Sequence, residues 1–117
     1  MSELRWLSPA AAAAEYVVVY VSCPQADSEA LARLFIEEKA AACVNIVATV
    51  RSLYRWQGAV EASEESMLII KTRAASLPRL AALIDQHHPY DVPELIAMPI
   101  CAGLPAYLNW IDDCIVN

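Results

Sequence analysis

The chain has 117 residues, 58% of them hydrophobic, and a formal net charge of −6 at pH 7. Its eight Lys and Arg residues are not clustered, which argues against nucleic acid as a partner, because phosphate contacts require a basic stripe. No apolar stretch reaches the ~18–20 residues that span a membrane, so the hydrophobic excess predicts a core and subunit interfaces.

The N-terminal residues 1–15 are predicted to be a tail that either docks or stays mobile, and residues 16–117 to be one domain. Glu3 and Pro9 interrupt the charged and apolar blocks that a signal peptide would need. The cysteines show no Cys-x-x-Cys spacing, and a domain of this size needs no disulfides. We therefore expect a cytoplasmic protein with reduced thiols. The four cysteines are Cys23, Cys43, Cys101 and Cys114.

The first predicted elements are a buried strand over residues 16–21 and a helix. The strand follows from a β-branched and aromatic run, and Cys23-Pro24 ends it. Asp27 or Ser28 can cap the helix.

A long hairpin is predicted next, with strands over residues 44–56 and 60–72 joined at Gln57-Gly58. Thirteen residues extend roughly 43 Å, far beyond a domain with a radius of gyration of about 13 Å. The hairpin is therefore expected to bend at a β-bulge and to pair with another chain. The period of two predicts a shared face for Val44, Ile46, Ala48, Val50, Tyr54 and Trp56.

The second half of the chain predicts a helix, a strand and a final helix. Ser76 caps the first of these helices, which should end at His87-His88 because Pro89 disfavours helical geometry at His88. The apolar run over residues 94–100 is typical of a strand buried on both faces. Gly103 and Pro105 then open the last helix.

The resulting order, β-α-β-β-α-β plus a C-terminal helix, predicts an α+β fold of the ferredoxin-like type. Two helices would cover one face of a four-stranded antiparallel sheet. Three subunits with their sheets inward would cover the other face.

Five segments, in matching order and spacing, resemble the CutA divalent-cation tolerance proteins over about residues 16–112. The resemblance implies a homotrimer similar to the PII signalling proteins, which bind small ligands in clefts between subunits. It also implies a link to tolerance of copper and other divalent ions. The five segments are residues 38–45, 52–58, 70–72, 88–94 and 106–110.

Copper binding in that family is associated with a histidine pair, matched here by His87 and His88, and with a cysteine of the first strand. Val21 stands at the place of that cysteine, and Cys23 lies two residues on, on the same strand face. Imidazole and thiolate are ligands that copper prefers. His87 has an alternative interpretation, since it extends the apolar stripe of its helix and would then be a packed core residue. His88 is expected to face the loop.

Three hypotheses for function remain open: binding of copper or another divalent cation, a PII-like module that signals to a partner protein, and an assembly scaffold without a ligand. Glu61, Glu64 and Glu65 form either a solvated strand face or the wall of an intersubunit cleft. In the second case they line it with Lys71, Tyr90 and Glu94. We do not expect an enzyme, because the chain has no nucleophile motif and only two glycines. The aromatic residues predicted to anchor the trimer interface are Tyr54, Trp56, Tyr107 and Trp110.

Overall fold

The computed structural model describes residues 3–9 and 13–115, so Ala10–Ala12 of the predicted tail lie outside the described residues. The sheet has the strand order β2-β3-β1-β4, and all neighbouring strands are antiparallel. The predicted ferredoxin-like fold with a C-terminal helix is thus confirmed. The elements are β1 (Tyr16–Cys23), α2 (Ser28–Glu37), β2 (Cys43–Trp56), β3 (Ala59–Arg73), α3 (Leu77–His87), β4 (Ile96–Pro99) and α4 (Pro105–Ile115), with 3-10 turns at Gln25–Asp27 and Ala74–Ser76.

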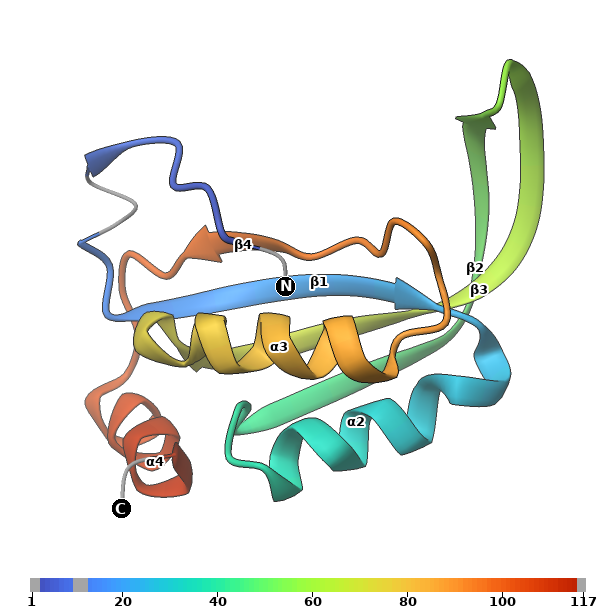
Figure 1. Ribbon diagram of the computed structural model, residues 1–117. Coiled ribbons are helices and arrows are strands. Elements are labelled where there is room, and N and C mark those ends of the chain that lie inside the picture. The colour runs from blue at the N-terminus through green and yellow to red at the C-terminus, as the bar shows by residue number, and fades with distance from the viewer. Residues whose placement is uncertain (1–2, 10–12, 116–117) are drawn as a thin grey trace.

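Helices α2 and α3 pack against one face of the sheet, as Figure 1 shows, and the core lies between them and the strands. Alternate residues of β1, from Val17 to Cys23, point into this core, together with Phe35 of α2 and Leu80 of α3. Each such side chain contributes about 1.5–3 kcal/mol when fully buried. Leu4 of the N-terminal segment also packs against the core. No helix within the described residues is long and apolar enough to cross a membrane.

Strand β4 is shorter and more exposed than predicted. It covers Ile96–Pro99 and lies at the edge of the sheet, where Pro99 is tolerated because the side without a partner needs no N–H donor. The expectation of a strand buried on both faces is wrong. Ile96 and Met98 are exposed on the face opposite the helices.

The predicted β-bulge is confirmed in β2. The pairing register with β3 shifts between Val47 and Val50, so that Ala48 and Thr49 together oppose Ser66. The Ser66 hydroxyl donates to the Ala48 carbonyl at 2.7 Å. The Gln25 side-chain amide donates to the same carbonyl at 3.1 Å and to the Thr49 hydroxyl at 2.8 Å. A side chain from the turn before α2 therefore holds the bulge.

The bulge inverts the alternation of side chains along β2. Val44 opposes the buried Ile70, whereas Val50 and Tyr54 oppose Glu65 and Glu61, which point to the other face of β3. The prediction of one shared face from Val44 to Trp56 is therefore wrong, because the extra residue shifts the phase by one.

The outer half of the hairpin rises away from the helical layer beyond this bend (Figure 1). Gln57 and Gly58 both have positive φ, 49° and 82°, which suits a two-residue turn between twisted strands. The overhang predicted from strand length is present.

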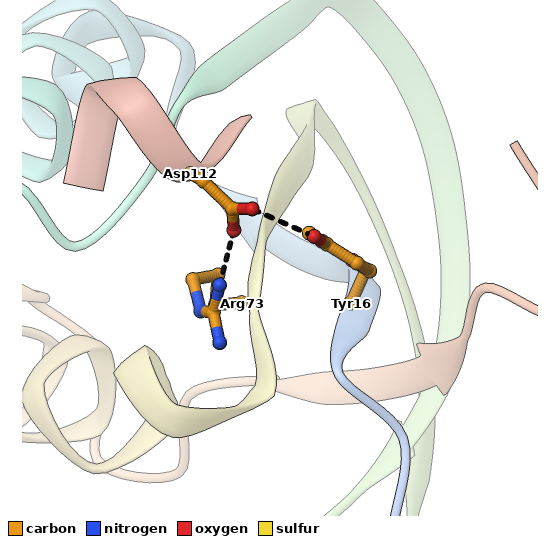
Figure 2. A network of polar contacts seen from close by, with 3 residues as sticks. All are labelled: Tyr16, Arg73 and Asp112. Carbon is orange, nitrogen blue, oxygen red and sulfur yellow. Dashed lines mark hydrogen bonds and ion pairs between the residues drawn. The ribbon is translucent and has the colours of Figure 1, made fainter. Parts of the chain in front are cut away.

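Helix α4 is tied to the sheet by a polar cluster (Figure 2). Asp112 accepts a hydrogen bond from the Tyr16 hydroxyl at 2.9 Å and forms an ion pair with Arg73. This hydrogen bond is the main cause of the raised pKa of Tyr16. A carboxylate near a helix C-terminus is disfavoured by the helix dipole. The cation that offsets it comes from β3 of the same chain.

Replacement of Asp112 by Ala should lower the free energy of unfolding by about 1 kcal/mol, because a half-buried ion pair is lost. Urea denaturation measures the change. Asp113→Ala is the matched control, since Asp113 is the exposed neighbour on the same helix. Equal destabilisation by the two variants would contradict an anchoring role for Asp112.

Candidate ligand-binding cleft

A cavity of about 820 Å³ lies between the outer half of the hairpin and the connection that follows α3. The hairpin wall includes Arg51, Tyr54 and Trp56, all placed beyond the bulge. Ser22 and Glu65 also line the cavity. The connection supplies Pro89, Tyr90, Asp91, Val92 and Glu94. We call this cavity the hairpin cleft.

Tyr90 and Glu65 form the best-defined contact of the hairpin cleft. The Tyr90 hydroxyl donates to Glu65 Oε2 at 2.6 Å, and the Glu65 residue is only 6% exposed. Burial is the main cause that raises the pKa of Tyr90, and the hydrogen bond to Glu65 adds to it. The phenol therefore stays protonated and serves as the donor for a buried carboxylate.

His88 fixes the start of the same connection. Its Nδ1 accepts the backbone N–H of Tyr90 at 3.2 Å, and its Nε2 lies 2.8 Å from the Ser22 carbonyl. Since Nδ1 accepts, the ring proton resides on Nε2 and is donated to Ser22. The imidazole is therefore a neutral structural link, with both nitrogens already engaged.

A second link joins β1 to the far end of the connection. The Ser22 hydroxyl donates to Glu94 Oε1 at 3.2 Å. Ser22 thus holds His88 through its carbonyl and Glu94 through its side chain. This wall of the cleft is therefore fixed at both ends before any ligand arrives.

The three residues predicted as copper ligands are not brought together as a site. His87 is exposed at the end of α3, so its interpretation as a core residue is wrong, and His88, expected to face the loop, is buried. Cys23 is fully buried, and burial raises the pKa of its thiol to about 11. Among the described residues, no group of three or more His, Cys, Asp or Glu side chains is arranged to hold a metal ion. These residues do not fit copper as a ligand set.

The predicted cleft residues divide into two groups. Tyr90 and Glu94 line the hairpin cleft, whereas Glu61 and Lys71 do not. Lys71 instead donates to the Asn45 side chain, and Glu61 opposes Tyr54 near the hairpin tip.

The predicted interface aromatics also divide into two groups. Tyr54 and Trp56 line the hairpin cleft, while Tyr107 and Trp110 lie on α4 with ring centroids 5.5 Å apart. All four are partly exposed. Tyr54 and Trp56 thus present partly exposed rings to the hairpin cleft.

Sequence reasoning missed Arg51 and Asp91 as lining residues. Alternation along β2 puts Arg51 and Tyr54, three residues apart, on opposite faces of the strand, so a single-face pattern could not assign both to one cleft. For Asp91 the signal was its place in the stiffened connection between Pro89 and Pro93.

The fold is α+β and PII-like. The structure of a PII-like protein CutA from Nostoc sp. PCC 7120 in apo form is similar, with a TM-score of 0.80 and 31% identity over 85% of this chain and 96% of that chain. Residues 17–114 match the model of the CutA1 divalent ion tolerance protein family, and the chain belongs to this family. The resemblance predicted from five segments is confirmed.

Further relatives support the assignment. The divalent-cation tolerance protein CutA of Thermus thermophilus is 41% identical over 82% of this chain and 94% of its own length. The structure of CutA1 from Oryza sativa has a TM-score of 0.83 and 43% identity, covering 88% of this chain and 95% of that chain. A chloroplastic protein CutA of Arabidopsis thaliana is 44% identical over 86% of this chain, which spans only 56% of its length.

Native Cys23 should resist thiol reagents. At pH 8, a pKa raised from 9 to about 11 reduces the thiolate fraction about a hundredfold, and burial slows the reaction further. We expect Ellman's reagent to label a variant that retains only Cys101, which is exposed, at least about a hundredfold faster than one that retains only Cys23. Comparable rates would contradict the buried position of Cys23.

The same thiol should make stability depend on alkaline pH. The folded state holds the proton more tightly than the unfolded state, so this contribution is complete below pH 9 and is lost as pH rises toward 11. Cys23→Ala should flatten the decline in this window when unfolding is followed against pH. If the free energy of unfolding of Cys23→Ala declines with the same slope between pH 9 and 11, the decline belongs to other titrating groups.

Proposed function

We propose that this chain acts in divalent-cation tolerance as a homotrimeric, PII-like module that binds a small ligand in the hairpin cleft. Family membership supports the general role in cation tolerance. The observation that supports the finer proposal is the cleft itself, about 820 Å³ in volume and bounded by a connection held through His88 and Tyr90. Small-molecule sites commonly have volumes of about 300–1,000 Å³.

A homotrimer is supported by surfaces that a single subunit leaves uncovered. The sheet face opposite the helices exposes Val47, Ile96 and Met98. These exposed apolar side chains lie on both edge strands of that face, β2 and β4, and exposed apolar surface marks interaction sites. The hairpin overhang also presents the long edge strand β2, which invites pairing with another chain. Three subunits packed through these faces would bury both features.

Direct copper binding through His87, His88 and Cys23 is supported less well than ligand binding in the cleft. A copper ion there would have to displace the Ser22 carbonyl or the Tyr90 N–H from His88 and reach a thiol inside the core. We therefore favour a binding role for the cleft, without catalysis and without copper on these residues.

Thermal unfolding of the reduced protein with Cu(I), Cu(II) and Zn(II), together with measurement of its native mass, tests the assembly and the copper hypothesis. We expect a trimer and any copper-induced shift in Tm to be the same in wild type, His87→Ala and Cys23→Ala. A copper shift abolished by both substitutions would restore the direct copper site. A monomeric mass would contradict the trimer.

Ligand binding is tested by a thermal-shift screen of small metabolites that covers cationic, neutral and anionic classes. A ligand that binds only the folded state at about a hundred times its Kd adds ~2.7 kcal/mol to stability. The proposed function expects at least one such ligand. No stabilisation by any class would leave a scaffold without a ligand as the function.

A further inference from the structure

The charge of the hairpin cleft selects among possible ligands. Glu65, Asp91 and Glu94 contribute carboxylates to its lining, and Arg51 contributes a guanidinium, so ionised side chains leave a net excess of two negative charges. A concave site with low-dielectric walls focuses such a field. Anionic ligands, nucleotide phosphates included, are therefore disfavoured, and cationic ligands are favoured.

Aromatic rings line the same cleft. Tyr54 and Trp56 come from the hairpin and Tyr90 from the opposite wall. The face of an aromatic ring attracts an ammonium or guanidinium group by about 0.5–2 kcal/mol, most strongly for Trp. A ligand with a cationic group and an apolar body would match both parts of this lining.

The size of the cleft and its donor set distinguish an organic cation from a metal ion. A cavity of about 820 Å³ suits a metabolite, whereas one ion would occupy a small part of it. The described part of the chain holds no group of three or more His, Cys, Asp or Glu side chains arranged around a metal position. Both observations favour an organic ligand.

We infer that the hairpin cleft takes a small organic cation of the amine or guanidine class, with its cationic group beside Glu94 and its carbon skeleton against the aromatic rings. The inference rests on the proposed function, since it names the ligand class of that cleft. Glu94 is the natural contact because Glu65 is buried and already bound by Tyr90. Glu94 is only partly buried and accepts the Ser22 hydroxyl through one oxygen, Oε1.

The test is isothermal titration of the full-length protein with 1,4-diaminobutane, arginine, glutamate, ATP and Zn²⁺ as probes. We expect 1,4-diaminobutane or arginine to bind, with an affinity that falls as salt is added, and glutamate and ATP not to bind. Glu94→Gln keeps the shape of the side chain and removes its charge, and it should weaken binding about tenfold or more.

Glu61→Gln is the control, because it also removes one carboxylate, from a position on β3 that does not line the cleft. It should leave the affinity unchanged. Should Glu94→Gln fail to fold, Asp91→Asn takes its place, since Asp91 is an exposed lining residue and its charge contributes to the same field.

The outcomes separate this inference from the proposed function. Binding of glutamate or ATP without binding of either amine overturns the ligand class and leaves ligand binding intact. Binding of Zn²⁺ that Glu94→Gln abolishes, without binding of either amine, assigns the cleft to a metal ion instead. Amine binding weakened equally by Glu61→Gln and Glu94→Gln would mark it as nonspecific attraction to an acidic surface. Absence of binding by every probe, joined to a negative metabolite screen, removes both proposals.

Discussion

A bulge in a long strand must satisfy the backbone group that the extra residue removes from the ladder, and here that group is the Ala48 carbonyl. Ser66 of β3 and Gln25 of the turn before α2 both donate to it. Each of these hydrogen bonds contributes about 0.5–1.5 kcal/mol net, so the two donors stabilise the bent form of the hairpin. The bulge therefore sets the direction of the outer half of the hairpin. That half carries the cleft wall with Arg51, Tyr54 and Trp56.

The opposite wall of the hairpin cleft depends on polar side chains that the sequence alone would suggest as metal or ligand contacts. His88 uses both ring nitrogens to join β1 to the connection after α3, and Tyr90 uses its hydroxyl to satisfy Glu65. A fully satisfied buried network is rigid, because each partner would leave another group unpaired if it moved. The network therefore organises the cleft, and the imidazole that resembles a metal ligand is part of the scaffold.

Local chemistry predicted much of this structure. Pro89 ends α3 at His87, with His88 extended at φ −78° and ψ 134°, and strand length alone indicated the bulge. The prediction of one shared face along β2 was wrong because it continued the alternation of side chains unchanged through the bulge. Helical spacing placed His87 on the buried face of its helix. Periodicity tells on which face a residue lies, but not whether the neighbouring layer extends far enough to cover it. The cleft itself needed contacts between β1, β3 and the 88–94 connection, which are far apart in sequence.

The position of Tyr54 and Trp56 connects ligand binding to assembly. Both side chains line the hairpin cleft, and both were predicted as interface anchors on the overhanging hairpin. In a trimer joined through these hairpins, the bound ligand and the neighbouring subunit would contact the same rings, so their binding free energies would be coupled. Such coupling is reciprocal: a ligand that strengthens subunit association must itself bind more tightly to the trimer than to the free subunit, by the same factor. The acidic lining adds an electrostatic component, because subunits brought together with unneutralised carboxylates repel one another. A cationic ligand would relieve that repulsion, and it would therefore favour assembly through charge as well as through contact.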